Sequence, residues 1–412
     1  MTSPRICIFT ETYYPVVGGG ETQARLLAEN LVASGFPVVV LTRRSDATYE
    51  SIERYGEVTV HRLQPVGRGQ HKKWGLLFSS IPRLFRLRRQ YDLIFVSGFR
   101  IVGISAVLVS KLLGKACVLK ADSQGEMSGD FFDAGLEKLG LPLLRIPFGL
   151  FLKVRDFILK RADAFAAITL DIAAELTIKG LGRDVIFMIP NSVDTVQFSP
   201  VDHRQKQELR RRLDLSETNI TVIYTGRLVS YKGLPLLLEV WREIVRQYSN
   251  LTLLLVGTGG LDIHNCEDEL KKYVVGNSLQ ESVCFTGSVR NVPEYLQASD
   301  IYVLPTENDA FPSALIEAMA CGLPVVTTPV GAIKTIVKDK QNGLLVRPRD
   351  FQQLYDALDK LINDATLSKH LGQAGSQTVQ ERYSAEIVTQ EYIDLFCALV
   401  DQPENTVEEA VS

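Results

Sequence analysis

Two cations stand in one short loop of the C-terminal half of the chain. The run GRLVSYKG at 226–233 carries Arg227 and Lys232, with glycine at both ends, and follows the apolar, β-like run NITVIYTG at 219–226. Arginine offers a planar fork of donors and lysine a mobile point charge, so the pair suits the oxygens of a diphosphate. The alternative is a pair of solvated surface charges.

A second loop, within PTENDAFPSALIEAMACG at 305–322, carries carboxylates. Asp309 stands in the loop itself, and Glu317 follows in a helix that we expect to be capped by Ser313 and to stop at Gly322. A carboxylate beside a phosphate site would repel the phosphate, so these groups are better suited to accept hydrogen bonds from sugar hydroxyls. The alternative is that they only interact with the helix dipole, which is worth about 0.3–1 kcal/mol.

A third loop contains three consecutive glycines, Gly18 to Gly20, between the first apolar run and the first helical pattern. Glycine lets the backbone approach a phosphate, and a helix N-terminus supplies free N–H groups and a positive dipole. The spacing is not the GxGxxG of dinucleotide-binding proteins, and the next strand ends in LTRR rather than in an acid. A flexible loop is the alternative interpretation.

These loops are positioned by a regular alternation of apolar runs and helical patterns. We expect strands at 5–10, 37–42, 91–98, 116–122, 162–169 and 184–191, and then at 219–226, 251–257, 282–287, 300–305 and 323–328. Runs that are apolar on both faces and separated by helices are typical of parallel sheets covered on both sides. The sequence therefore predicts an α/β fold of two Rossmann-like, doubly wound parallel sheets. Ligands bind at the carboxyl ends of such strands, so loops of the two sheets would face an interdomain cleft.

The composition excludes several classes of protein. Forty-five Lys and Arg against 48 Asp and Glu leave a net charge of -3, which argues against a nucleic-acid-coating chain. The sequence contains no uncharged apolar run long enough to span a membrane, and Glu11 interrupts the N-terminus before a signal peptide could form. The six cysteines and five histidines lack paired spacing, so we expect reduced thiols, a cytoplasmic protein and no metal cofactor.

As a set, several motifs resemble the retaining glycosyltransferases of family 4. They are the carboxylate pair Asp309 and Glu317 and the runs IPNSVDTVQF at 189–198, GRLVSYKG at 226–233, FTGSV at 285–289 and EAMACGLPVV at 317–326. The resemblance covers almost all of the chain. It implies the GT-B fold and transfer of a hexose from a nucleotide-diphosphate sugar to a hydroxyl acceptor, with retained anomeric configuration and without a bound metal.

The resemblance also implies a role for each candidate residue. Arg227 and Lys232 would hold the donor diphosphate and neutralise the leaving group, Glu317 would bind the ribose, and Asp309 would hold the hexose. The other implied contacts are made by Gly18, Gly19, Val289, Ala310, Phe311, Pro312 and Ser313. The two glycines would close over the diphosphate, the backbone near the valine would contact the base, and the last four residues would help to hold the hexose.

Two positions depart from the family pattern. The first carboxylate is Asp309 where the family usually has Glu, and its side chain is one methylene shorter. Many members carry a histidine in the loop that here reads ADSQGEMSGD, and Asp122 or Ser123 stands nearest to that place, with Glu126 close by. We retain Asp122 as a substrate-binding candidate. The departures leave open a nucleotide-sugar-binding GT-B module with little or no turnover, whereas a nucleotide-sugar epimerase is disfavoured because no further acid/base cluster is present.

The strand pattern restarts after residue 200, and the resemblance adds a C-terminal helix that returns, so we expect four parts. Residues 1–195 would form the N-terminal acceptor domain and 196–378 the C-terminal donor domain, while 379–400 would be a helix that returns to the N-terminal domain and 401–412 an acidic tail.

Basic and apolar residues alternate in two N-terminal stretches. Residues 58–91 contain eight Lys and Arg and no acid, interleaved with Trp, Leu and Phe, and 141–163 is apolar with spaced basic residues. Such stretches suit an anionic membrane surface, at about 1 kcal/mol per cation near it. The alternative is an apolar core with a solvated basic rim. The membrane interpretation predicts a peripheral location on the inner face of the plasma membrane, and an acceptor that is lipid-linked or a glycan under assembly.

Overall fold

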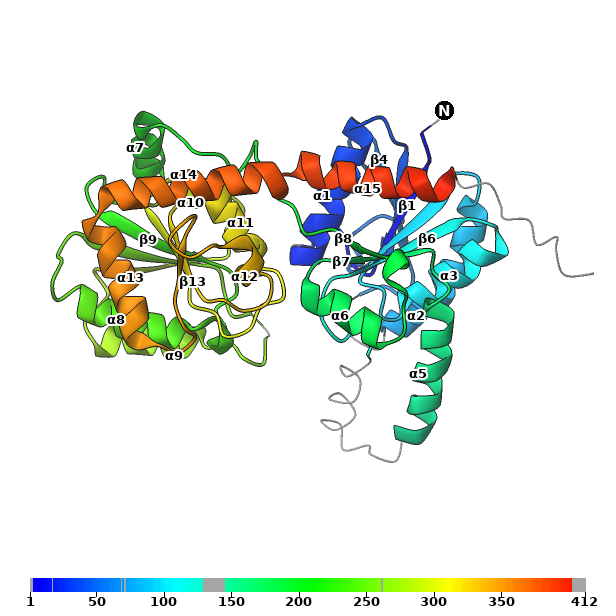
Figure 1. The fold of residues 1–412 in the computed structure, drawn as a ribbon, viewed down its shortest axis with the longest axis horizontal. Helices are drawn as coiled ribbons and strands as arrows, with labels where there is room; N and C mark the ends of the chain where they lie inside the picture. Colours follow the sequence, from blue (N-terminus) through cyan, green and yellow to red (C-terminus); the bar gives the residue numbers. More distant parts are fainter. Residues whose placement is uncertain are drawn as a thin grey trace, which may run out of the picture. The chain divides into compact units, whose positions relative to one another are not determined.

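The computed structural model describes residues 3–16, 18–67, 69, 72–128, 145–260 and 262–401, but not the side chains of residues 73 and 145–148. The chain forms two compact units, 1–191 together with 385–412, and 192–384. Each is built on a largely parallel sheet with helices on both faces (Figure 1). This arrangement confirms the predicted fold class. Most of the predicted tail at 401–412 and the start of the predicted basic stretch at 141–163 lie outside the described residues.

Within the described residues, the first unit contains an eight-stranded sheet in the order β3-β4-β2-β1-β5-β6-β7-β8. Its strands are β1 (Ile6–Thr10), β2 (Val38–Arg43), β3 (Ile52–Tyr55), β4 (Val58–Leu63), β5 (Leu93–Ser97), β6 (Ala116–Ala121), β7 (Ala164–Ala167) and β8 (Ile186–Met188). The β3–β4 pair is antiparallel, and the other described pairs are parallel. Every residue of β1, β2 and β5 is buried, as a sheet covered on both faces requires.

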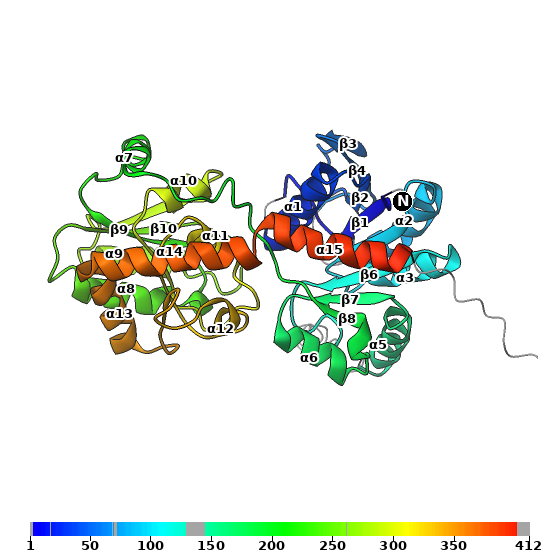
Figure 2. The ribbon, with the colours of Figure 1, turned by 45° about the horizontal axis from the view of Figure 1, so that its top comes forward.

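Helices cover both faces of this sheet. They are α1 (Gly19–Ala33), α2 (Lys72–Leu87), α3 (Val102–Leu112), α5 (Arg145–Leu159), α6 (Leu170–Ile178) and α15 (Ala385–Val400), with a 3-10 turn at Arg183–Val185. Helix α15 contacts α1 on one side, whereas α2, α3 and α5 form a contiguous group on the other (Figures 1 and 2). Thus α15, which is far away in the sequence, is part of the first unit.

The sequence analysis did not predict β3 or β4. Residues 58–63 were assigned only to a basic stretch, yet β4 pairs with β2 and its Val58, Val60 and Leu63 side chains are buried. Arg62 on the same strand forms a 2.7 Å ion pair with Glu53 of β3, and its side chain is not exposed. A basic residue in this segment therefore belongs to the sheet rather than to a solvated surface.

The second unit, in its described part, has a six-stranded parallel sheet in the order β11-β10-β9-β12-β13-β14. The strands are β9 (Ile220–Thr225), β10 (Leu251–Val256), β11 (Val283–Gly287), β12 (Ile301–Leu304), β13 (Val325–Thr327) and β14 (Leu344–Leu345). The helices are α7 (His203–Arg212), α8 (Leu234–Ile244), α9 (Glu267–Gly276), α10 (Val292–Gln297), α11 (Ser313–Ala320), α12 (Ile333–Ile336), α13 (Phe351–Asn363) and α14 (Ala365–Arg382), with a 3-10 turn η3 at Ser230–Lys232. The predicted strands of both units are present, and short β14 is an addition.

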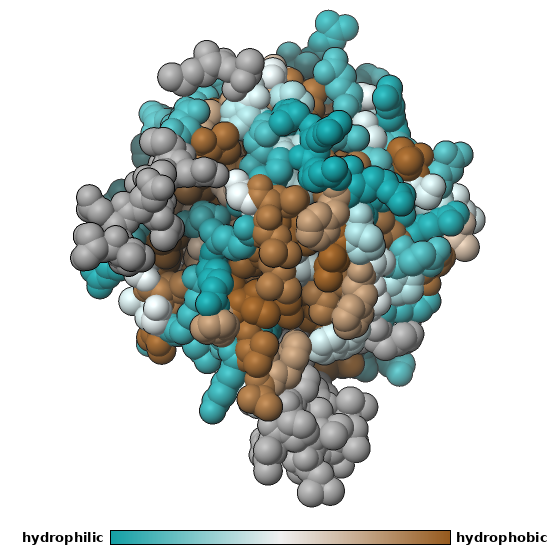
Figure 3. All heavy atoms as spheres, turned by 90° about the vertical axis from the view of Figure 1, so that its right-hand side faces the viewer, coloured by the Kyte–Doolittle hydropathy of each residue, from teal (hydrophilic) through white to brown (hydrophobic). Residues whose placement is uncertain are grey.

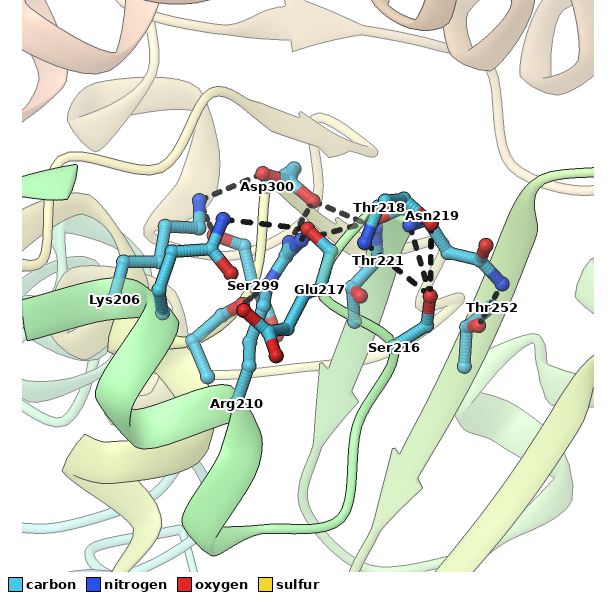
Figure 4. Close-up of polar contacts among 12 residues, drawn as sticks. Lys206, Arg210, Ser216, Glu217, Thr218, Asn219, Thr221, Thr252, Ser299 and Asp300 are labelled. Atoms are coloured by element: carbon cyan, nitrogen blue, oxygen red, sulfur yellow. Dashed lines mark hydrogen bonds and ion pairs between the residues drawn. The ribbon is translucent and has the colours of Figure 1, made fainter. Parts of the chain in front are cut away.

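An ionic network at the amino-terminal edge of this second sheet anchors α7 (Figure 4). The Asp300 carboxylate pairs with Lys206 Nζ at 2.6 Å and with Arg210 at 2.5 Å, and it also accepts the Thr221 N–H at 2.7 Å. The buried Arg210 guanidinium also donates to the carbonyl oxygens of Ala298 and Asn219. Since ligands of parallel sheets bind at the opposite, carboxyl edge, this network is structural.

Replacement of Asp300 by alanine is expected to lower the free energy of unfolding by about 1–3 kcal/mol, because a buried guanidinium and a backbone N–H lose their acceptor. Urea denaturation would measure the change. The matched control is Glu208→Ala, which removes an exposed ion pair with Arg211 and should change stability by no more than about 0.5 kcal/mol. Equal effects of the two substitutions would contradict an anchoring role for Asp300.

Candidate active site

The loops that leave the carboxyl ends of the second unit's strands meet one another. The loop after β9 touches the loop after β10 through a backbone bridge between Val229 and Asn265. It also touches the loop after β12, because the Glu307 N–H donates to the carbonyl oxygen of Tyr231 at 2.8 Å. These bonds hold the predicted cation loop and the predicted carboxylate loop side by side.

Two glycines make this close approach possible. Gly233 ends η3 in a left-handed conformation with a φ of 73°, and a Cβ atom there would lie 2.0 Å from the carbonyl oxygen of Pro305. Gly257, with a φ of 134°, would place a Cβ atom 1.9 Å from the carbonyl oxygen of Gly226. Any other residue at either position would force the neighbouring loops apart.

The structure places Lys232 and Asp309 in direct contact. Their side chains form an ion pair and are only 15% and 13% exposed. The lysine comes from η3 after β9 and the aspartate from the loop after β12, so the contact joins residues 77 positions apart. The sequence analysis assigned these side chains to opposite partners, a diphosphate and a sugar, and did not foresee that they pair with each other.

Arg227 lies in the same loop but has different partners. Its guanidinium forms an ion pair with Asp262 in the loop after β10 and donates to the Tyr231 hydroxyl at 2.7 Å. Its side chain is 60% exposed. The sequence analysis missed Asp262 and Tyr231, although both follow parallel strands at the carboxyl edge, where the rule for ligand positions in such sheets could have found Asp262.

Glu317 stands on α11, one turn beyond the helix start. Burial raises the pKa of its carboxyl group to about 7. Among the described residues, no hydrogen bond to this carboxylate is found. Burial raises the pKa of Tyr302 and of Cys321, and the nearby Glu317 charge raises both further. Glu317 is nevertheless partly exposed, so its carboxylate can accept hydrogen bonds from a ligand, and Glu317 suits a binding role.

The segment from Ala310 to Ser313 leads from Asp309 into α11. Phe311 and Pro312 are buried, and the Ala332 N–H donates to the Ala310 carbonyl oxygen at 2.9 Å. The N-cap of α11 is Pro312, and no side-chain hydrogen bond caps the helix, so the prediction of Ser313 as its cap was wrong. Ser313 is instead the first helical residue.

Val289 follows β11 at the same edge of the sheet and is partly buried. The described hydrogen bonds and ion pairs do not connect its backbone to the other candidates. The structure thus brings Lys232 and Asp309 into contact and leaves Val289 separate from them.

In the first unit, Gly18 and Gly19 begin α1. Gly18 is the N-cap in an extended conformation, and a Cβ atom there would lie 2.4 Å from the Glu21 carboxylate. A Cβ atom on Gly19 would meet nothing within 4 Å, so its backbone is open. A Cβ atom on Gly20 would lie 3.6 Å from the Asp122 carboxylate. The loops after β1 and β6 therefore lie close together.

Asp122 is held by a set of polar partners. Its carboxylate pairs with the buried Lys120 at 2.7 Å and accepts a hydrogen bond from Ser97 Oγ at 2.8 Å. Its N–H donates to Glu126 at 3.1 Å, and Lys120 also donates to Asn191 at 2.9 Å. The sequence analysis missed Lys120 and Ser97, because each reads as one polar residue in an otherwise apolar strand.

Family models match both units of the chain. The model for "Glycosyl transferase 4-like domain" matches residues 18–192, and the model for "Glycosyl transferases group 1" matches residues 205–378. The chain belongs to the family-4 type of glycosyltransferases. The two matches meet between residues 192 and 205, close to the point where the chain passes from the first unit to the second.

Several relatives of this glycosyltransferase are known. It is 33% identical to an uncharacterized glycosyltransferase of Haemophilus influenzae over 42% of the chain, a match that spans only 48% of that relative. It is 24% identical over 96% of the chain, and 97% of the relative, to the N-acetyl-alpha-D-glucosaminyl L-malate synthase of Bacillus anthracis. An Anabaena protein, Alr3699/HepE, solved in complex with UDP and glucose, superposes over 96% of this chain and 100% of its own, with a TM-score of 0.73 and 18% identity. The likeness shows that the glycosyltransferase has the GT-B fold.

Proposed function

We propose that this protein is a retaining glycosyltransferase that moves a hexose from a nucleotide-diphosphate sugar to a hydroxyl acceptor. The observation that carries the proposal is the contact between Lys232 and Asp309 at the carboxyl edge of the second sheet. There, one loop offers cations to a diphosphate while the adjoining loop offers a carboxylate to a sugar. The complex of the Anabaena protein with UDP and glucose supports the same class of donor.

The chemistry follows from charge. Cleavage of the bond between sugar and phosphate builds positive charge on the sugar and negative charge on the departing diphosphate. Lys232 and Arg227 would stabilise the diphosphate, because preorganised charges lower the barrier more than mobile water does. Asp309 would accept hydrogen bonds from the hexose, with the backbone of residues 310–313 beside it. The leaving phosphate would take the proton of the acceptor on the same face, so the step needs no strong protein base.

Glu317 would accept hydrogen bonds from the ribose in its ionised form. Because burial raises the pKa of this group to about 7, the free protein holds a proton there that the donor complex must release. Donor affinity should therefore rise with pH. It should be about tenfold weaker at about pH 6 than at about pH 8. Calorimetric titration with UDP-sugars would measure it.

The control for this pH dependence is Glu317→Gln, which keeps the shape of the side chain and cannot ionise. Its donor affinity should be weak and flat over the same pH range. A dependence that persists in Glu317→Gln would assign the titration to another group, of which Glu126 is the candidate, since burial raises its pKa to about 7 as well.

In the first unit, Asp122 would contact the transferred sugar, and the backbone of Gly18 and Gly19 would approach the diphosphate. Lys120 and Ser97 fix the orientation of the Asp122 carboxylate before any ligand arrives. We propose that the transfer needs no metal cofactor, because Lys232 and Arg227 would neutralise the departing diphosphate.

The acceptor would be lipid-linked or a glycan under assembly, and the protein would work in the cytoplasm at the inner face of the plasma membrane. Within the described ranges, no helix combines the length and the apolar character needed to cross a bilayer.

Release of nucleotide from UDP- and GDP-sugars, with crude lipid and free sugars as acceptors, tests the function. Turnover that needs one donor and one acceptor class is expected. A second candidate, a binding module without turnover, is favoured by the shorter Asp309 and its pairing with Lys232. Tight binding of a nucleotide sugar without release of nucleotide, over the whole panel, would select the binding module.

A further inference from the structure

The two basic stretches of the first unit differ once the fold is known. In α2, the apolar residues Leu76, Leu84 and Leu87 are buried, so these side chains belong to the core. Phe78 is the large apolar residue of α2 that remains exposed. The first stretch thus follows the core-and-rim alternative over most of its described length.

Helix α5 behaves in the opposite way. Leu150, Val154 and Phe157 are each more than half exposed, and their spacing places them on one face of the helix. Leu108 and Leu112 on the adjoining α3 are exposed as well, and the two helices pack together. Figure 3 shows the result as a broad apolar area on this side of the first unit. We call these five residues the α3–α5 face.

Cations accompany this face. Lys153 is exposed between Leu150 and Val154, and the Arg161 guanidinium lies over the Phe157 ring at 3.6 Å from its centroid. Among the described residues, Asp163 pairs with Lys111 and Asp156 pairs with the inward-pointing Arg155. Lys153 and Arg161 therefore place two positive charges beside the exposed apolar side chains.

We infer that the α3–α5 face docks the protein on an anionic lipid surface. Apolar side chains flanked by lysine and arginine suit the boundary between headgroups and acyl chains, where both types of contact form at once. A second copy of this chain is the less suitable occupant, because a two-fold interface would enclose Lys153 and Arg161 of both copies, and these like charges would repel one another. The inference rests on the proposed function in one respect only: a lipid-linked acceptor would give the protein a reason to bind a membrane.

The test is flotation of the full chain with vesicles of phosphatidylcholine, with or without phosphatidylglycerol. The wild type should float with the anionic vesicles at low salt, should be released by high salt, and should not float with phosphatidylcholine alone. The double variant Leu150→Gln, Phe157→Gln should lower the bound fraction at least about tenfold. The matched control is Leu170→Gln, Ile178→Gln, which alters two exposed apolar residues on α6 and should bind like the wild type.

Charge is tested separately with Lys153→Glu, Arg161→Glu, for which Arg204→Glu, Lys272→Glu is the control at two exposed positions of the second unit. Only the first pair should abolish binding. Thermal unfolding of every variant shows that the chain is folded. Absence of binding at low salt, or equal losses in test and control variants, would overturn the inference.

Light scattering tests whether a second copy of this chain covers the α3–α5 face. A dimeric wild type that becomes monomeric in Leu150→Gln, Phe157→Gln would show that a second copy covers the face, and would also overturn the inference. Nucleotide release with a soluble acceptor is measured in parallel. Turnover without vesicle binding would refute the docking face alone, whereas vesicle binding without turnover on any donor would refute the proposed function alone.

Discussion

Replacement of Lys232 by alanine is expected to lower kcat by about 10²–10³-fold, the largest catalytic effect that the site predicts. The Lys232 side chain lies at the carboxyl edge of the second sheet and is only 15% exposed. In the alanine variant, water would therefore be a poor substitute for its positive charge. Its charge would act on the diphosphate as the bond to the sugar breaks. Steady-state release of nucleotide at saturating donor would measure the loss.

The substitution has a side effect that the experiment must separate. Lys232→Ala leaves the Asp309 carboxylate without its cation, and an unpaired carboxylate would repel the donor. The double variant Lys232→Ala, Asp309→Asn removes that repulsion. The single variant Asp309→Asn measures what the loss of the carboxylate costs by itself. If the double variant is much less active than Asp309→Asn, the missing lysine charge is responsible, and if the two are equally active, the lysine only neutralises Asp309.

Lys271→Ala is the matched control for this experiment. It removes an exposed lysine of α9 that pairs with Glu267, and it should leave kcat within about twofold of the wild type. A Lys232→Ala enzyme with unchanged turnover would contradict the assignment of the diphosphate to the loop after β9.

Replacement of Phe396 by alanine is expected to lower the free energy of unfolding of the first unit by about 3–5 kcal/mol. Phe396 of α15 is fully buried, with its ring 5.6 Å from Phe95 of β5 and 5.7 Å from Tyr392. Its removal would leave a cavity between helix and sheet that neighbouring aromatic rings are too rigid to fill. Chemical denaturation followed by tyrosine and tryptophan fluorescence would measure the effect.

Ile387→Ala on the same helix is the control, since Ile387 is 41% exposed. Its expected cost is below about 1 kcal/mol. The contrast would show that the last helix stabilises the first unit although the whole second unit separates them in the sequence. A small effect of Phe396→Ala would mean that α15 leaves the sheet easily in solution.

Much of the fold followed from local pattern. Strands such as β1 and β9 are apolar on both faces, and only a sheet covered on both sides buries such a run completely. β3 and β4 were missed, because Arg62 and the basic residues after it obscured the alternation, and Glu53 on the neighbouring strand neutralises Arg62 only after the strands pair. Pairing partners of this kind are invisible in a single segment.

The candidate site, too, was predictable only in part. The carboxyl-end rule led to the loops after β9 and β12, since the place of a loop at a parallel sheet depends on chain order alone. The choice of side chains that meet there does not depend on chain order alone. Lys232 reaches Asp309 and Arg227 reaches Asp262 because glycines at 233 and 257 let the loops touch.

By itself, the sequence determined the two parallel-sheet units, the family and the loops that carry the charged residues. Periodicity, loop order and residue type can all be taken from the chain itself, without knowledge of which elements pack together. Only the tertiary structure decided that Leu76, Leu84 and Leu87 of α2 belong to the core while Leu150, Val154 and Phe157 of α5 are exposed. Both helices are amphipathic in sequence, and which apolar face becomes buried depends on the helices and strands that pack against it.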